Sequence, residues 1–474
     1  MSLTLKGLKY DDFKKAGFRR DDRFMGEVAA LVFQGEQYYI PEERILVKYE
    51  KGDWKTITRE ERPKIAEAIA LRIEKELGNP KNLSDSKKAE LAQYKAYLVN
   101  YFRKARYFNA AFQILVSLDE IRKPLSEWFP EYMVRAGNKV LFFDPSSHSI
   151  EWDEMHPTYL LRKSLGCDLD FDAKCPNIEK FLFQVSEGNV DKIAYLKKLI
   201  GLIILGDRSL QEFYIILGPS DSGKSVLVSL LFSLLKGFAV SVPFGAFELS
   251  RNEGVPADIA LLEGHLVGFA SESQPDSYFN TQRLKTLTSS EEVVARKYHG
   301  NWYSFTNRAL LLFATNHISR INDDSDAMIT RMRVIQFNKS FTGEANPNLL
   351  VELREELSGL LNLALEGIQS FWDEGLEPYD EMKEFLADIR THTNPSDSFI
   401  EENLVKNNGC EIKASDLYSL FKSWCINLGI RPVSQKRFGE RMNMRYPGHH
   451  VKKSIYYYVN IEYSGYDYLN FEEF

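Results

Sequence analysis

A short loop with two glycines, a lysine and a serine carries the clearest chemistry in this sequence. It follows the apolar run at 213–217 and precedes a helix-like stretch at 226–235. A strand, a G-x-x-x-x-G-K-S loop and a helix in this order are typical of a phosphate-binding P-loop. The glycines let backbone N–H groups close around phosphates, and the helix N-terminus adds a favourable dipole. The residues expected to bind the nucleotide are Gly218, Pro219, Ser220, Asp221, Ser222, Gly223, Lys224 and Ser225.

Two side chains of this loop have separate expected roles. Lys224 would reach the β- and γ-phosphates, and Ser225 is placed to hold Mg²⁺. ATP and Mg²⁺ are therefore the expected cofactors. The alternative is a chance glycine turn, which the strand and helix periodicity on either side of the loop disfavours.

Hydrolysis of a nucleoside triphosphate also needs a carboxylate near the metal and the attacking water. A strand-like run at 265–271 is followed by Glu272, which we expect to act as the catalytic base. The residue before it is Ser271 and not a second acid. Coordination of Mg²⁺ would therefore rest on Ser225, the phosphates and water. The alternative is that Glu272 is a surface residue at the end of a strand.

Three further polar residues follow in an order that fits the same chemistry. The apolar run at 309–315 precedes Asn316, whose amide can orient the attacking water. Arg331 and Arg333 lie at the edge of a later strand-like run. One of them would act as an arginine finger on the nucleotide of a neighbouring subunit. The alternative is that all three residues are structural, and their order along the chain favours the functional interpretation.

A cationic hairpin is predicted in the middle of this region. Strand-like segments at 293–296 and 302–305 flank a tight turn that contains Lys297 and His299. Cations and aromatic residues at a hairpin tip suit a nucleic-acid backbone, through phosphate neutralisation and stacking. The alternative is an exposed hairpin with incidental charge.

The overall composition is that of an ordinary globular protein with one basic region. The chain has 474 residues, of which 44% are hydrophobic and 27% charged, and its formal net charge is −7. Its length predicts several domains. No apolar run suits a membrane span, the N-terminus is polar, and the four cysteines lack metal-ligand spacing, so we expect a cytoplasmic protein with reduced thiols. Cationic residues gather between 431 and 453, as in a DNA-reading module.

The order of these motifs resembles that of superfamily 3 helicases. The P-loop, the single Glu272, the Ala-Arg-Lys-Tyr-His segment at 295–299, Asn316 and the strand at 331–337 recur in this order in that superfamily. The likeness is to the helicase half of phage and plasmid primase-helicases and to the poxvirus nucleoside-triphosphatase.

The resemblance also extends to both sides of this core. Upstream, the segments Gly52-Asp-Trp54, Arg135-Ala-Gly-Asn138 and 171–182 are similar to the domain that precedes the helicase in that family. Downstream, 415–425 and 455–461 are similar to its winged helix. The resemblance covers about residues 35–463 of the chain.

The resemblance implies an α/β fold with an AAA+ P-loop core, a helical preceding domain and a C-terminal winged helix. Periodicity alone predicts a long amphipathic helix over 347–374 and, after 394, helices followed by an alternating hairpin. The expected domains are an N-terminal α+β domain over 1–95, a helical domain over 96–190, the ATPase core over 191–345, a helical segment over 346–393 and the winged helix over 394–474.

The winged helix would place two groups of cations on DNA. Base contacts would come from a recognition helix and phosphate contacts would give a steep salt dependence. The alternative is that the module docks a partner or caps a ring, with its cations solvated. The residues concerned are Lys436, Arg437, Arg441 and Arg445 in the helix and Lys452 and Lys453 in the wing.

Two departures from the family pattern qualify these expectations. Thr330 stands before Arg331 where the family often has another arginine, so the finger is either Arg331 or Arg333. About 100 residues precede the helicase-associated helices, fewer than a polymerase-type primase domain needs. We therefore expect a stand-alone helicase, or replication initiator, of a phage, plasmid or phage-satellite island, with a separate primase or initiator as its partner.

Three functions remain open at this point. The first is an ATP-driven helicase that acts as a homo-oligomeric ring, a hexamer, on single-stranded or forked DNA. The second is a sequence-specific initiator that binds origin duplex and uses hydrolysis to remodel the complex. The third is a DNA-triggered ATPase of a defence system, which a strand-displacement assay would separate from a helicase.

Overall fold

The chain forms two compact units. One comprises Met1–Phe171 with Leu234–Phe238, and the other comprises Asp172–Ser233 with Ala239–Phe474. The computed structural model describes residues 19–32, 37–76, 84–249, 256–271, 277–296, 301–319, 321, 327–343, 346–452 and 455–464. Within these ranges, every helix is either too short or too polar to cross a bilayer.

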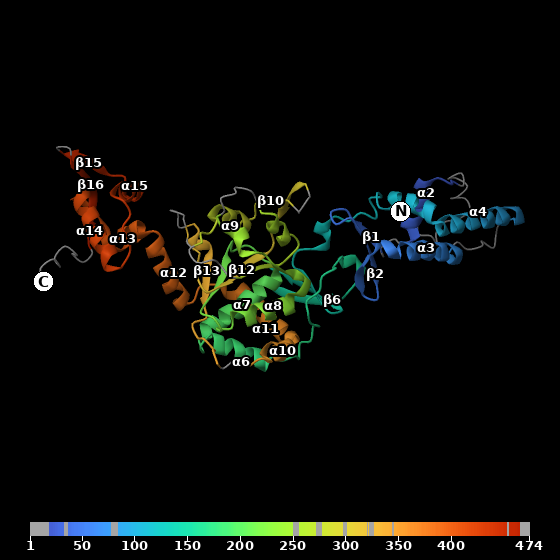
Figure 1. Ribbon diagram of the computed structural model, residues 1–474, viewed down its shortest axis with the longest axis horizontal. Helices are drawn as coiled ribbons and strands as arrows, with labels where there is room; N and C mark the ends of the chain where they lie inside the picture. The colour runs from blue at the N-terminus through green and yellow to red at the C-terminus, as the bar shows by residue number, and fades with distance from the viewer. Residues whose placement is uncertain are drawn as a thin grey trace. The chain divides into compact units, whose positions relative to one another are not determined.

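The helices of the first unit pack around a shared apolar core. Ile65, Ile69 and Ile73 recur every four residues and are buried together, because this spacing puts them on one face of a helix. Phe102 and Ala111 from later helices complete the same cluster. The helices, coloured from blue to cyan in Figure 1, are α2 (Asp22–Val32), α3 (Arg62–Glu76), α4 (Asp85–Arg103) and α5 (Ala105–Leu115).

Two antiparallel sheets of three strands complete the first unit. Trp54 and Trp128 meet edge to face, with ring centroids 4.9 Å apart, in a cluster that also contains Val140. This cluster joins residues of both sheets into one core. The first sheet contains β1 (Gln37–Ile40), β2 (Ile45–Glu50) and β3 (Asp53–Ile57), and the second contains β4 (Met133–Ala136), β5 (Lys139–Asp144) and β6 (Ser149–Glu154).

A parallel sheet of five strands organises the second unit and confirms the expected α/β core. Its strand order is β13-β7-β12-β9-β8. The central strand is buried along its whole length, as a continuous apolar run in a parallel sheet requires. The strands are β7 (Phe213–Leu217), β8 (Ala239–Ser241), β9 (Val267–Ser271), β12 (Leu310–Thr315) and β13 (Met332–Gln336).

Helices and one hairpin accompany this sheet (Figure 1). The hairpin pairs β10 (Glu292–Arg296) with β11 (Trp302–Thr306). The segment expected as one helix over 347–374 is two helices, α10 (Leu349–Arg354) and α11 (Leu357–Glu374). The other helices are α6 (Pro176–Val185), α7 (Val190–Leu205), α8 (Lys224–Leu235), α9 (Thr281–Thr288) and α12 (Asp380–Thr393), and the 3₁₀ turn η8 (Ile329–Arg331) leads into β13.

The C-terminal part of the second unit has an apolar core of its own. Phe399, Phe421 and Phe438 pack together, and the rings of the last two are stacked at 4.4 Å. The sheet order is β14-β16-β15. The elements are α13 (Pro395–Asn403), β14 (Leu404–Lys413), α14 (Ala414–Asn427), α15 (Gln435–Arg445), β15 (His449–Lys452) and β16 (Ile455–Tyr463). The finer assignment as a winged helix stays a prediction.

Candidate nucleotide-binding site

The glycine-rich loop leaves the carboxyl end of β7 and enters α8. Leu217, the last residue of β7, pairs with Thr315, the last residue of β12. The N–H of Gly218 then donates to the carbonyl oxygen of Thr315 at 3.3 Å. The loop therefore begins at the carboxyl edge of the sheet, where ligands of open α/β sheets bind.

Both glycines of the loop are needed because neighbouring residues lie too close to leave space for a side chain. A Cβ on Gly218 would lie 2.2 Å from the carbonyl oxygen of Phe337. A Cβ on Gly223 would lie 2.8 Å from a methyl group of Val185, and Gly223 also has φ of +92°. Side chains at these two positions would therefore force the loop away from β13 and α6.

Lys224 carries a buried charge that forms no ion pair with an acid among the described residues. The residue is only 8% exposed. Its Nζ donates to the carbonyl oxygens of Gly218 at 2.7 Å and Pro219 at 2.5 Å, and to the hydroxyl of Ser222 at 3.2 Å. Burial lowers the pKa of Lys224, because these neutral oxygens replace water only in part. A bound phosphate would supply the missing negative charge, so the residues present fit such a group.

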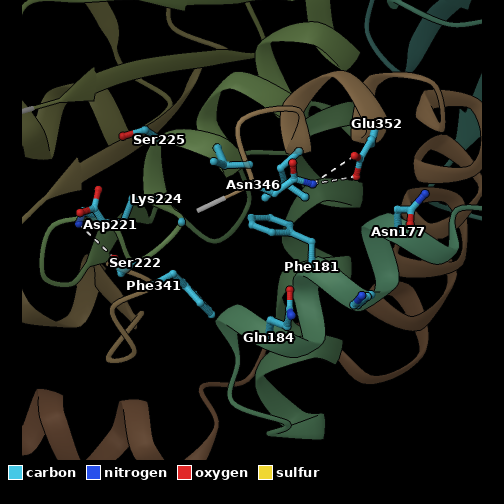
Figure 2. Close-up of a pocket in the computed structure, with 14 residues that line it drawn as sticks. Asn177, Phe181, Gln184, Asp221, Ser222, Lys224, Ser225, Phe341, Asn346 and Glu352 are labelled. Carbon is cyan, nitrogen blue, oxygen red and sulfur yellow. Dashed lines mark hydrogen bonds between the residues drawn. The ribbon is translucent and has the colours of Figure 1, made fainter. Parts of the chain in front are cut away.

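A cavity of about 370 Å³ adjoins the loop. Figure 2 shows Lys224 and Ser222 on one side of it and Phe181 on the other. Phe341 and the amides of Asn177 and Gln184 also line it. An aromatic ring with nearby amides can hold a nucleobase by stacking and by hydrogen bonds to its edge. The sequence did not predict these lining residues, because they lie far from the loop along the chain.

Glu356 fixes the start of α6, the helix that carries Phe181. Its carboxylate accepts hydrogen bonds from the backbone N–H groups of Asn177 and Ile178, both at 3.0 Å. It also accepts one from the side-chain amide of Asn177 at 2.7 Å. A carboxylate at this end satisfies N–H groups that have no partner inside the helix and interacts favourably with its dipole.

The segment after β13 covers the outer side of the loop. The N–H of Phe341 donates to the carbonyl oxygen of Asp221 at 2.9 Å. The hydroxyl of Ser340 donates to the carbonyl oxygen of Ser220 at 3.1 Å, and that of Thr342 to the Asp221 carboxylate at 3.2 Å. Polar residues that no sequence motif singled out thus hold the loop in its curved shape.

The predicted base and water-orienting residue follow two neighbouring strands. Ser271, at the end of β9, pairs with Ala314 of β12, so the carboxyl ends of both strands lie at the edge where the loop begins. Asn316 directly follows β12 and is exposed. Glu272 lies outside the described residues, and its role stays a prediction.

The two predicted arginines lie at the amino ends of the strands, at the edge of the sheet opposite the loop. Met332, the first residue of β13, pairs with Phe213, the first residue of β7. Arg331 donates to the hydroxyl of Thr288 at 2.9 Å. Arg333 forms an ion pair with Glu212, and their side chains are 16% and 6% exposed. Neither arginine therefore lies near the phosphate-binding loop of its own chain.

The groups expected to contact DNA differ in their surroundings. Lys297, His299 and Lys453 lie outside the described residues. Lys436 and Arg437 are exposed at the start of α15. The remaining three cations pair with acids: Arg441 with Asp397 at 3.4 Å, Arg445 with Glu401 at 2.9 Å, and Lys452 with Glu411 at 2.9 Å.

A metal site built from protein ligands alone is absent from the part of the chain that the structure describes. No three His, Cys, Asp or Glu side chains gather there in a suitable cluster. Ser225, the predicted Mg²⁺ ligand, is exposed at the start of α8 and lines the cavity beside Lys224. A hydroxyl in this position fits a hard cation that keeps most of its ligands as water and phosphate oxygens.

The part of the chain around this site is similar to known proteins. Residues 216–333, from β7 to β13, match a family described as a family of unknown function (DUF5906). Over 275 residues, 53% of its length, the chain is 22% identical to "Putative helicase L207/L206" of Acanthamoeba polyphaga mimivirus. It spans 28% of the length of that protein.

The fold is similar over nearly the whole chain to the apo C-terminal region of NrS-1. One structure of that region has a TM-score of 0.50 and 12% identity, covering 93% of this chain and 100% of the other. A second structure of the same region also has a TM-score of 0.50 and covers 94% of this chain. The chain is thus similar in sequence to a protein named as a helicase, and similar in fold to the NrS-1 C-terminal region.

Proposed function

We propose that this protein is an ATP-dependent DNA helicase of the superfamily 3, AAA+ type. The buried ammonium of Lys224, whose hydrogen-bond partners among the described residues are neutral oxygens, is the observation that carries the proposal. It lies where β7 ends and α8 begins, beside a cavity with room for a nucleotide. The similarity to the mimivirus protein supports the helicase part.

The residues of one chain would divide the work at the phosphates. Lys224 and the backbone N–H groups of the loop bind and orient the triphosphate, and Ser225 holds Mg²⁺, which neutralises charge on the phosphates when bound. Glu272 accepts a proton from the attacking water, and Asn316 orients that water. Phe181 and Gln184 hold the base.

A neighbouring subunit would complete the site. Because the arginines lie at the opposite edge of the sheet from the loop, either would act on another chain's nucleotide. The two contacts favour Arg331 as the finger, since Arg333 is held by the buried carboxylate of Glu212. Such head-to-tail contacts close into rings, and we propose a hexamer with Lys297 and His299 of each hairpin on DNA in the channel.

The test is the variant Lys224→Ala beside Lys383→Ala, an exposed lysine of α12. Removing the Lys224 ammonium should weaken nucleotide binding and reduce ATP turnover and forked-duplex unwinding by at least about 100-fold. Lys383→Ala should match the unchanged protein in all three measurements. Circular dichroism checks that both variants fold, and unwinding by folded Lys224→Ala at the normal rate would overturn the proposal.

A second candidate function is origin recognition by the C-terminal part. Its separate apolar core and the exposed Lys436 and Arg437 at the start of α15 favour this addition. A chain that ends after Thr393 should keep ATP turnover and lose any preference for one duplex sequence over another. Loss of sequence preference without loss of turnover identifies an initiator, and unchanged DNA binding by the shortened chain contradicts this role.

A further inference from the structure

A cationic cavity in the first unit has no part in the nucleotide site. Its volume is about 600 Å³. It is formed by the β2–β3 turn, the β4–β5 turn, the segment at 162–168 and residues 236–237. Its charged lining is five cations against two acids, on a chain whose formal net charge is −7. These residues are Lys51, Arg135, Arg162, Lys163 and Lys236, with Asp53 and Asp168. Arg162 also pairs with Glu43, which does not line the cavity, at 2.7 Å.

Two sequence segments that the nucleotide site leaves without a role meet at this cavity. They are Gly52-Asp-Trp54 and Arg135-Ala-Gly-Asn138. The guanidinium of Arg135 donates from Nη1 to the Asp53 carboxylate at 2.7 Å and from Nε to the Gly137 carbonyl oxygen at 2.8 Å. Asp53 and Arg135 are 82 positions apart, so the fold brings both segments to one wall.

Hydrogen bonds fix the segment at 162–168 beside this wall. The N–H of Leu165 donates to the carbonyl oxygen of Arg135 at 2.7 Å, and the N–H of Gly166 to that of Leu234 at 2.7 Å. The N–H of Gly137 donates to the hydroxyl of Ser164 at 3.2 Å. Arg162 and Lys163 are therefore next to a segment held by hydrogen bonds to two parts of the chain, which reduces the entropy lost when an anion binds.

The cations range from buried to exposed, and the two exposed lysines are called the rim below. Arg135 is 8% exposed and Lys163 is half-buried, whereas Lys51 and Lys236 are exposed. Burial lowers the pKa of Lys163 to about 8, with a smaller contribution from the charge of Arg162. An anion in the cavity would offset this cost by stabilising the ammonium.

The chemistry of the lining points to phosphate and away from a base. Guanidinium, ammonium and amide N–H groups are strong donors to phosphate oxygens. None of the lining residues is aromatic, so the cavity has no platform on which a base could stack. Lys51 and Lys236 are exposed, so an extended polyanion can reach them from solvent.

We propose that this cavity binds the phosphodiester backbone of a single DNA strand. It would be a DNA contact separate from the hairpin and from the C-terminal helix, and it would read no sequence. The choice of DNA as the polyanion rests on the proposed helicase function, whereas the preference for phosphate rests on the cavity itself.

The experiment compares two double variants of the full chain that remove equal charge. Lys51→Gln with Lys236→Gln changes the rim, and Lys55→Gln with Lys64→Gln changes two exposed lysines of the same unit that do not line the cavity. Binding of a fluorescent oligo-dT strand is measured by anisotropy over a range of salt concentrations. The rim variant should bind less tightly and lose about 0.7 in the slope of log K against log salt for each lost contact.

The control double variant should keep the slope of the unchanged protein. Equal slopes for the two double variants, or no binding of the strand by the unchanged protein, overturn the proposal. Lys163→Met retains most of the aliphatic part of the side chain without its charge, and should bind the strand as weakly as the rim variant does. Pyrophosphate is tested as a competitor: a rim variant that loses pyrophosphate binding but keeps the DNA slope shows a small-anion site instead.

ATP turnover without DNA separates this proposal from the helicase proposal. It should be the same in the rim variant and the unchanged protein, because Lys51 and Lys236 do not line the nucleotide cavity. If the unchanged protein hydrolyses no ATP but the two double variants differ in salt slope, the helicase proposal fails and the DNA contact stands. If ATP hydrolysis is normal but the two slopes are equal, the DNA contact fails and the helicase proposal stands.

Discussion

Arg331 and Arg333 are two positions apart but have different roles in the fold. Arg333 faces the carboxylate of Glu212, which also accepts a hydrogen bond from Tyr214 at 2.8 Å. Burial raises the pKa of Glu212, against the opposing charge of Arg333. Arg331 instead donates to a neutral hydroxyl, that of Thr288. Arg333 therefore stabilises the fold, and Arg331 is the arginine that we propose to act on the nucleotide of another subunit.

Alanine at each position should separate these roles. Arg333→Ala leaves a buried carboxylate without its partner and should lower the free energy of unfolding by about 3 kcal/mol. Arg331→Ala should cost less than about 1 kcal/mol and reduce ATP turnover by about 1000-fold if it is the finger. Urea denaturation and steady-state turnover measure the two effects. Full turnover in Arg331→Ala, at a protein concentration where the oligomer forms, would move the finger elsewhere.

Among the elements, those next to the loop illustrate what local sequence can predict. The strand β7, the loop and α8 follow one another within 213–235, so periodicity and glycine spacing identify them without tertiary information. The cavity wall on α6 could not be predicted in this way, since it depends on packing between segments far apart in the sequence. The expected helix over 347–374 is interrupted between α10 and α11, and Glu356, which lies at this break, caps α6.

The sequence also failed to predict the strand β14, and here the reason is different. Its residues are mostly exposed and polar, and its pairing with β16 shifts register between Lys406 and Glu411. Gly409, with φ of +92°, lies within this irregular stretch. An edge strand of this kind has no regular alternation of apolar side chains, so it resembles a loop in sequence.

Removing the Glu356 carboxylate should weaken α6 and the nucleotide site together. Glu356→Ala leaves the N–H groups of Asn177 and Ile178 without this acceptor, and should lower the free energy of unfolding by about 1 kcal/mol. Nucleotide affinity should fall a few-fold, because Phe181 is on the same helix. Glu355→Ala, one position earlier and exposed, is the matched control. Equal affinity in both variants would show that α6 does not depend on this cap.

At the scale of the whole molecule, the proposed ring should make turnover depend on protein concentration. Each site would need a loop from one chain and an arginine from the next, so dilution below the assembly constant should reduce turnover per chain more steeply than it reduces nucleotide binding. Native mass spectrometry over the same concentration range reports the oligomer. Constant turnover per chain in a demonstrated monomer would contradict the need for a second subunit.

The five residues of β7 separate the loop from the arginine edge by about 15 Å, beyond the reach of an arginine side chain. Two defective proteins should therefore repair each other. Lys224→Ala chains retain a working arginine, and Arg331→Ala chains retain a working loop. In an equal mixture that assembles at random, about one contact in four joins an intact loop to an intact arginine, so about a quarter of normal turnover should return. Genetic complementation between two inactive alleles would then be a direct consequence of the direction in which one strand runs.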